Sequence, residues 1–267
     1  MGFRRNQAKS IGVALQGIGA KAGAMKIIFS RKGFDSSAGG GPSPIVDGRA
    51  LSLPIPDGQR ISRTTYGNLG LGGHAKRASR GKLSGRHRCH NDPMFLESGA
   101  AMLGQCGAAQ THLANHGVGP GDLFLFFGLF CGDDGDPHHR VFGFLDIERM
   151  VDLTTCSEAE RAEFVALDHP HALGLHASND AIYCGRGASN APALDALRLT
   201  IPGENPSLWQ VPAWLEEVGL SYHARETRWL GQGRLQSVAR GQEFVADVGE
   251  REDVREWARS IIELIES

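Results

Sequence analysis

The sequence predicts an α+β fold: a single domain with a mixed, mostly antiparallel sheet or partly open barrel, flanked by helices. Two apolar runs, 119–130 and 139–153, are separated by a turn sequence and predict a hairpin at the centre of a sheet. Residues 253–267 carry apolar side chains at helical spacing, which predicts an amphipathic helix packed on that sheet. No internal repeat and no clear linker divides the 267 residues, so one domain is more economical than two.

Composition narrows the classes of protein. With 41% hydrophobic residues the chain can bury a substantial core, and no run of 18 apolar residues predicts a membrane span. The formal net charge of −2 argues against a globally basic nucleic-acid coat, although a local patch can still bind phosphate. Five cysteines, an odd number without a C-x-x-C pair, predict free thiols and a reducing cytoplasm.

The first 24 residues are expected to form a disordered extension, and the domain spans 25–267. Cations precede a weakly apolar segment, as in a signal peptide, but Gln16, Gly17 and Gly19 interrupt it. The first convincing strand begins at Met25 and runs to residue 30. We therefore favour an extension over a secretion signal.

The segments before the hairpin are predicted from turn signals and composition. Residues 46–58 read as a turn followed by a short strand that ends at two prolines. Residues 60–93 are basic and rich in glycine, and they predict a solvated or mobile loop or, alternatively, a segment that tracks phosphates. Residues 97–118 are rich in alanine and predict an amphipathic helix.

The segments after the hairpin predict further strands. Residues 181–186 and 196–203 are strand candidates, and 207–215 carries aromatic residues beside prolines. Residues 234–248 predict a strand, a turn at Gly241 and a second strand.

The loop FSRKGFDSSAGGGPSP, residues 29–44, follows the first strand and is the leading candidate for ligand binding. Hydroxyls, cations and glycines at a strand exit can surround an anionic or sugar-bearing ligand. The residues proposed to contact phosphate or ribose are Ser30, Arg31, Lys32, Ser36 and Ser43. Asp35 is a candidate acid/base or hydroxyl partner, while the alternative is an ordinary surface turn.

A second set of candidates lies near the C-terminus and faces the base of the expected ligand. Tyr222, His223 and Trp229 could stack on a base, although such aromatics are more often core residues. Gln242 and Glu243 could read a base edge or move a proton, or Glu243 could simply face solvent. Gln110 and His112 are expected on a polar pocket face. The catalytic candidates are therefore Asp35, His223 and Glu243.

No metal site is predicted, and no cofactor is identified. The hairpin turn CGDDGDPHH gathers Asp133, Asp134, Asp136, His138 and His139, but adjacent turn residues seldom converge on one ion. His112 and His116 share a helix face without an identifiable third ligand. The loop DHPHALGLHASND, 168–180, has three histidines, of which one or two could lie near a pocket.

Several long motifs, taken in order, resemble one known family. They include MKIIFSRKGFDSSAGGGPSPIVDGRALSLPIP, GQCGAAQTHLANHGVGPGDLFLFFGLF, LRLTIPGENPSLWQVPAWL, SYHARETRW and GQEFV. Over roughly residues 25–260 the chain is similar to the third nucleotide-modification-associated domain family of bacteria and phages. The resemblance implies a setting among DNA-modification or restriction proteins. The chain departs from the family pattern at Asn91 and at 128–131, where Cys131 puts a phosphate contact in doubt.

The strand pair GDLFLFF and VFGFLDI also resembles the core of PUA-like barrels, a pattern-level analogy that does not assign function. The leading hypothesis is a protein that binds a nucleotide or modified base and acts on it. The alternatives are a non-catalytic reader of modified DNA that serves a nuclease or transferase, and a structural assembly subunit. The leading hypothesis requires the loop after the first strand to form one cleft with Tyr222, His223 and Gln242.

Overall fold

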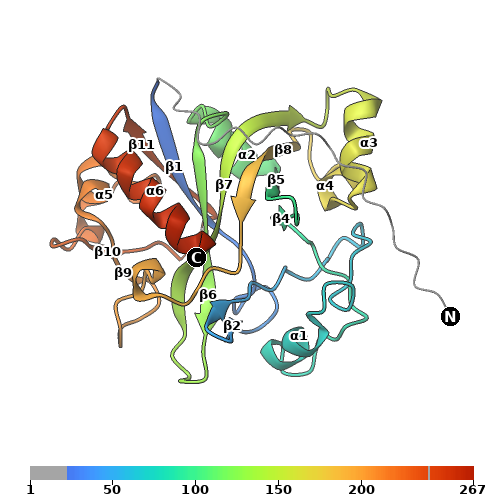
Figure 1. The fold of residues 1–267 in the computed structure, drawn as a ribbon, viewed down its shortest axis with the longest axis horizontal. Coiled ribbons are helices and arrows are strands. Elements are labelled where there is room, and N and C mark those ends of the chain that lie inside the picture. The colour runs from blue at the N-terminus through green and yellow to red at the C-terminus, as the bar shows by residue number, and fades with distance from the viewer. Residues whose placement is uncertain (1–22, 240) are drawn as a thin grey trace.

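A computed structural model describes residues 23–239 and 241–267, and its centre is one mixed sheet (Figure 1). The main strand order is β11 (Glu243–Gly249), β1 (Met25–Arg31), β6 (Leu123–Cys131), β7 (His138–Asp152), β8 (Ala181–Ala188), β5 (Ala100–Gln105) and β4 (Met94–Phe95). Along this order only β1 and β6 pair in parallel. The predicted α+β class with a mostly antiparallel mixed sheet is confirmed.

The remaining elements surround this sheet. The helices are α1 (Gly72–Ala78), α2 (Gly107–Asn115), α3 (Glu158–Ala166), α4 (Pro170–Leu173), α5 (Ala213–Val218) and α6 (Glu252–Glu266). Short strands β2 (Ser43–Val46) and β3 (Arg49–Ala50) pair with each other, and β2 also joins the end of β6. Strands β9 (Leu208–Gln210) and β10 (Arg234–Gln236) form a separate pair, and 3-10 turns occupy Asp195–Leu197 and Glu226–Arg228.

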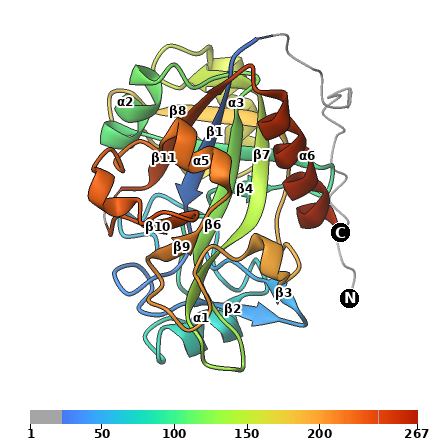
Figure 2. The ribbon, with the colours of Figure 1, turned by 90° about the vertical axis from the view of Figure 1, so that its left-hand side faces the viewer.

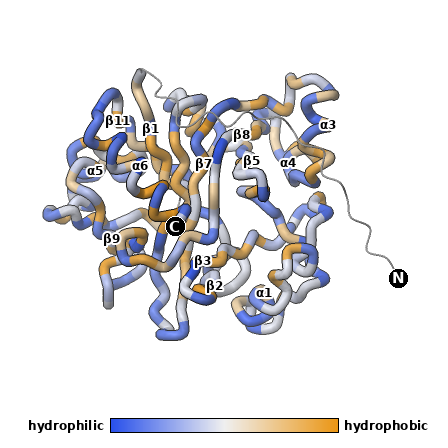
Figure 3. The backbone as a smooth tube through the Cα atoms, viewed as in Figure 1, coloured by the Kyte–Doolittle hydropathy of each residue, from blue (hydrophilic) through white to orange (hydrophobic). Residues whose placement is uncertain are grey.

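The predicted central hairpin is confirmed as β6 and β7. Residues 123–127 of β6 are all buried, because both faces of the sheet are covered. Figure 3 shows the hydrophobic residues gathered along the central strands. None of the described helices is long and apolar enough to cross a membrane.

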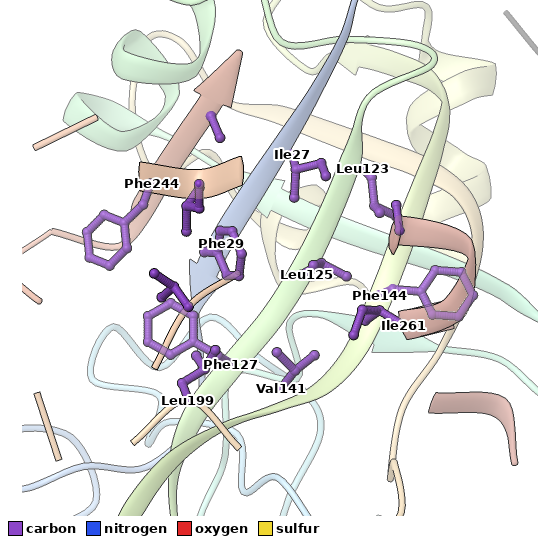
Figure 4. Packing of buried hydrophobic residues seen from close by; sticks show 14 of the residues in the cluster. Ile27, Phe29, Leu123, Leu125, Phe127, Val141, Phe144, Leu199, Phe244 and Ile261 are labelled. Carbon is purple, nitrogen blue, oxygen red and sulfur yellow. The ribbon is translucent and has the colours of Figure 1, made fainter. Parts of the chain in front are cut away.

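One face of the sheet packs against α5 and α6. Ile27 and Phe29 of β1 point to this face with Leu125 of β6, and Ile261 of α6 packs against the same cluster (Figure 4). The predicted C-terminal amphipathic helix is therefore confirmed, because its apolar stripe covers this core.

The other face forms the inside of a curled sheet. Phe124 and Phe126 of β6 pack there with Tyr183 of β8. Irregular pairing at two points along β7 accompanies its bend (Figure 2). Gln105 of β5 donates a 2.5 Å hydrogen bond to Glu243 of β11, although these strands lie far apart in the strand order. The sheet is therefore a partly open barrel whose two sides meet through polar side chains.

Two predicted elements are wrong in part. Residues 97–118 do not form one helix, because 100–105 are strand β5, paired with β8, and only 107–115 are helical. Pairing in the sheet overrides the helical preference of this alanine-rich segment. Residues 196–203 make isolated bridges to Arg140 and Trp209 instead of a strand.

The basic segment after the first strands is folded rather than a simple loop. It contains α1, and Tyr66, Ala75 and Cys89 pack with Phe34 and Leu53 into a small core of their own. The predicted strand in 46–58 shrinks to β3. The strands predicted at 25–30, 181–186 and 234–248 are present, but β10 and β11 belong to different sheets. The proposed extension lies outside the described residues up to position 22.

Candidate functional site

A cavity of about 270 Å³ lies where β1 ends. It is lined by the loop that leaves β1, the end of β5, the loop that carries His90, and helix α4 with His171. Another cavity is larger, about 490 Å³, but its walls include the apolar residues Met102, Phe164 and Leu167. The smaller cavity is the candidate site, because it gathers the acids, imidazoles and cations on which chemistry depends.

A buried ion pair supports one wall of this cavity, which Lys32 lines. Lys32 Nζ lies 2.7 Å from Oε1 of Glu243, whose side chain is 1% exposed. Gln105 Nε2 donates to the same oxygen. Glu243 Oε2 is buried and has no hydrogen-bond partner among the described residues. The strand pairing of β1 with β11 sets this geometry by placing Ser30 opposite Glu243.

Asp92 forms the centre of the opposite wall. Its Oδ1 accepts a 2.9 Å hydrogen bond from the Gly104 N–H. Its Oδ2 lies 3.7 Å from Nε2 of both His90 and His171. The fully buried His169 lies behind the carboxylate, with Nε2 3.6 Å from Oδ1. One carboxylate is therefore surrounded by three imidazoles.

A second buried carboxylate orients His171. His171 Nδ1 lies 2.5 Å from Oδ1 of Asp180, which has no exposed surface. The other oxygen of Asp180 accepts a 2.7 Å hydrogen bond from the His176 N–H. A Cβ atom at Gly104 would lie 2.2 Å from Cδ2 of His171. A glycine is thus required on β5 for the ring to occupy this place.

Burial and contacts set the charge of these groups. Burial alone would raise the pKa of Asp92, but the neighbouring imidazoles of His169, His90 and His171 hold that pKa well below its usual value. Burial lowers the pKa of His169 and of His176. At neutral pH, Asp92 is therefore an ionised carboxylate among imidazoles. The imidazoles of His169 and His176 are neutral.

The same cluster is the one group of three potential metal ligands found among the residues that the structure describes. His90, Asp92 and His171 each offer one ligand atom, and these atoms all lie within 4.8 Å of one another. The histidines of 168–180 were predicted as possible pocket residues, but their contact with His90 and Asp92 was not predicted. The dense run of histidines and acids in 168–180 was the available signal.

Comparison with known proteins identifies the family. Residues 26–247 match nucleotide modification associated domain 3. The chain belongs to this family. The resemblance seen in the motifs is confirmed, and the domain is one associated with nucleotide modification. No curated protein and no solved structure matched, and the PUA-like analogy is not confirmed.

Within this nucleotide-modification-associated domain, part of the predicted loop lies at the cavity. Arg31, Lys32 and Asp35 of this loop line it, together with Gln242, which precedes β11. Ser30 is buried, Ser36 is exposed, and neither lines the cavity. Ser43 is also buried, and its hydroxyl accepts a 3.1 Å hydrogen bond from the Leu53 N–H.

Two charged residues of the loop, Arg31 and Asp35, already have partners in the domain. Arg31 donates to the carbonyls of Val238 and Ala239 at 2.9 and 2.8 Å. Asp35 Oδ1 accepts from the N–H groups of Ser37 and Ala38, both at 2.7 Å, so it stabilises its own turn. These contacts shape the loop that forms the cavity wall.

The aromatic candidates near the C-terminus lie outside the cavity. His223 is fully buried, and its Nδ1 and Nε2 contact backbone groups of Ser221 and Val238. Trp229 donates to the His223 carbonyl. Tyr222 is half exposed and stacks on His112 of α2, with ring centroids 4.4 Å apart.

Gln110 is buried on α2 and accepts a hydrogen bond from the Tyr183 hydroxyl. The structure thus joins Gln242 and Glu243 to the β1 loop, and it leaves Gln110, Tyr222, His223 and Trp229 in separate contacts.

Proposed function

We propose that this domain binds a nucleotide or a modified nucleic-acid base in the cavity at the end of β1 and acts on it, within a bacterial or phage DNA-modification or restriction system. One observation carries this proposal. Lys32, which pairs with the buried Glu243, and the Asp92–histidine cluster line one cavity in a domain associated with nucleotide modification. A volume of about 270 Å³ suits a base or a small nucleotide.

The residues divide into binding and chemical roles. Gln242 is exposed at the cavity and offers an amide to a base edge, while Lys32 offers N–H donors to a phosphate or hydroxyl. Asp92 with His90 and His171 supplies the groups for proton transfer. Glu243 and Asp35 are the further acid/base candidates. Tyr222 and Trp229 would meet only a ligand that extends beyond the cavity, whereas the fully buried His223 is not accessible to a ligand.

Binding is tested by calorimetry with nucleoside phosphates and modified nucleosides. Replacing Lys32 alone would leave Glu243 as an unpaired buried charge, so we combine Lys32→Ala with Glu243→Gln. The double variant and Gln242→Ala should weaken binding, while Ser36→Ala, in the same loop but outside the cavity, should not. Equal affinity in all variants would reject the cavity as the binding site.

Turnover is tested by mass spectrometry of nucleotide pools and modified phage DNA after incubation with the domain. His90→Gln should abolish product formation, because this residue is assigned a chemical role. Binding without any product from the unaltered domain would remove the enzymatic part of the proposal.

A reader of modified DNA is the second candidate, and the basic segment 60–88 favours it. Eight cations and no acidic residue lie there: Arg60, Arg63, Lys76, Arg77, Arg80, Lys82, Arg86 and Arg88. All eight are exposed on the segment that contains α1. Such a surface can contact several phosphates of a polynucleotide.

Salt dependence distinguishes the reader from a domain that binds only free nucleotides. Each phosphate contact contributes about −0.9 to the slope of log K against log salt concentration for duplex DNA. Replacing Lys76, Arg77, Arg80 and Lys82 by Gln should reduce that slope without changing nucleotide affinity in the cavity. DNA binding that is independent of salt and of these substitutions would exclude the basic segment as the contact surface.

A further inference from the structure

The cavity carries more negative than positive charge. Arg31 and Lys32 face Asp35 and Asp92 across it, and Glu243 and Asp180 bond directly to its walls. These are two cationic side chains against four carboxylates, an excess of two acidic groups before the imidazoles are counted. Such a cavity would repel a phosphate unless a further positive charge were present.

We propose that His90, Asp92 and His171 bind one divalent transition-metal ion. The proposal rests on three donor atoms that already face one another: Nε2 of His90, Nε2 of His171 and Oδ2 of Asp92. It deepens the proposed function, because a dication would balance the excess charge and offer an anchor to a phosphate or hydroxyl oxygen of the ligand.

The distances suit an ion of this class. Donor atoms that each lie about 2.0–2.1 Å from a tetrahedral zinc ion stand roughly 3.3 Å apart. The carboxylate oxygen lies 3.7 Å from each imidazole nitrogen, and all three donor atoms lie within 4.8 Å of one another, so the side chains would draw closer around a bound ion. Three protein ligands would leave a coordination position for water or substrate.

The surroundings of His171 match the usual support of a metal-binding imidazole. Asp180 contacts Nδ1, which leaves Nε2 directed at Asp92. A carboxylate in this place fixes the tautomer and the orientation of a ligating ring. Gly104 adds a second constraint, because its N–H binds Asp92 and its missing side chain makes room for the ring.

The ligand types select the metal. Two imidazoles and one carboxylate suit zinc or ferrous iron, whereas magnesium and calcium prefer oxygen ligands. We therefore expect binding of Zn²⁺ or Fe²⁺, with Co²⁺ as a spectroscopic substitute, and weak binding of Mg²⁺.

The test is metal binding by the purified full chain without nucleotide. After removal of metals with a chelator, the chain is titrated separately with Zn²⁺, Co²⁺, anaerobic Fe²⁺ and Mg²⁺, and metal content is measured by mass spectrometry. One equivalent of Zn²⁺ or Fe²⁺ per chain, with a visible absorption band for Co²⁺, is expected. No retained transition metal, or retention no tighter than that of Mg²⁺, would overturn the proposal.

Variants locate the ion. His171→Gln and Asp92→Asn should lose the Co²⁺ band, and Asp180→Asn should weaken affinity about 10–100-fold. His90→Gln, at a partly exposed position, provides the same test if the buried variants do not fold. The matched control is His116→Gln on α2, which should bind normally. Full binding in folded ligand variants would overturn the assignment.

The two proposals fail separately. Metal binding without affinity for any nucleotide would remove the proposed function and leave the metal site. Nucleotide binding that depends on Lys32 and Gln242, by a chain that retains no transition metal, would remove the metal site alone.

Discussion

Two regions of this domain contain histidines beside aspartates, and they differ in how those side chains are used. One is the cavity with His90, Asp92 and His171. The other is the hairpin turn between β6 and β7, the strongest local cluster of Asp and His in the sequence. In the cavity, the potential metal-ligand atoms of these three residues lie within 4.8 Å of one another.

In the turn, the His and Asp side chains form hydrogen bonds and an ion pair with neighbouring residues. His138 contacts the Asp136 carbonyl through Nδ1 and Arg140 through Nε2, at 2.9 and 3.2 Å. His139 Nδ1 accepts a 3.0 Å hydrogen bond from the Trp209 indole, and Asp136 pairs with Arg198 at 2.6 Å. These contacts close the end of the hairpin and leave no converging set of donors.

Potential ligand residues that are adjacent in sequence are therefore poor evidence for a binding site. Adjacent residues on a turn or strand point in different directions, whereas a binding site needs donors that converge from several elements.

Breaking the buried ion pair of the cavity should cost the most. Lys32→Met leaves Glu243 buried without its cation and should lower the free energy of unfolding by about 3–5 kcal/mol. Combining it with Glu243→Gln should restore most of this loss. Urea denaturation measures both, and a single variant as stable as the unaltered domain would show that the pair is not buried in solution.

Filling the space at Gly104 should come next. Gly104→Ala places a methyl group against the His171 ring and should destabilise the domain by about 1–3 kcal/mol through overpacking. It should also weaken metal binding without removing a ligand. Gly73→Ala, on α1 where a Cβ would meet nothing within 4 Å, is the control. Thermal denaturation and Co²⁺ titration provide the readouts.

Lowering the pH should reduce the free energy of unfolding of the domain through His139 of the hairpin turn. Burial and then the charge of Arg31 lower the pKa of His139 to about 3, below the unfolded value of about 6.5. As pH falls through this window the unfolded chain binds the proton first, so stability falls by up to about 1.4 kcal/mol per pH unit. This contribution is fully present above pH 6.5.

His139→Asn keeps an acceptor for Trp209 and removes the titrating ring. Its free energy of unfolding should therefore depend less on pH between about 3 and 6.5. Urea denaturation at a series of pH values compares the two proteins, and parallel curves would show that His139 titrates normally.

The smallest effect is expected at the rim of the turn. Asp136→Ala removes a partly exposed pair with Arg198, which should change stability by about 0–1 kcal/mol. It should leave metal content unchanged. Loss of bound metal in this variant would reverse the comparison and make the turn the metal site.

Much of the fold could be predicted, because its strongest signals are local. The long apolar runs of β6 and β7 and the apolar stripe of α6 follow from periodicity alone. Strand β5 was mistaken for helix, because its place in the sheet depends on pairing with the distant β8.

The site could be predicted only in fragments. Lys32 and Glu243 were each named, but their contact joins residues 211 positions apart. Asp92 meets His171 only in the tertiary fold, where both lie against Gly104 of β5. Neither contact has a local signature, since both depend on the tertiary fold.

The central claim is that the functional centre is the cavity at the end of β1 rather than the hairpin turn. Anomalous X-ray diffraction from crystals of the chain loaded with one equivalent of Zn²⁺ or Co²⁺ tests it most directly. We predict a single peak bonded to Nε2 of His90, Nε2 of His171 and Oδ2 of Asp92. A peak beside His138 and Asp136, with none in the cavity, would contradict the claim.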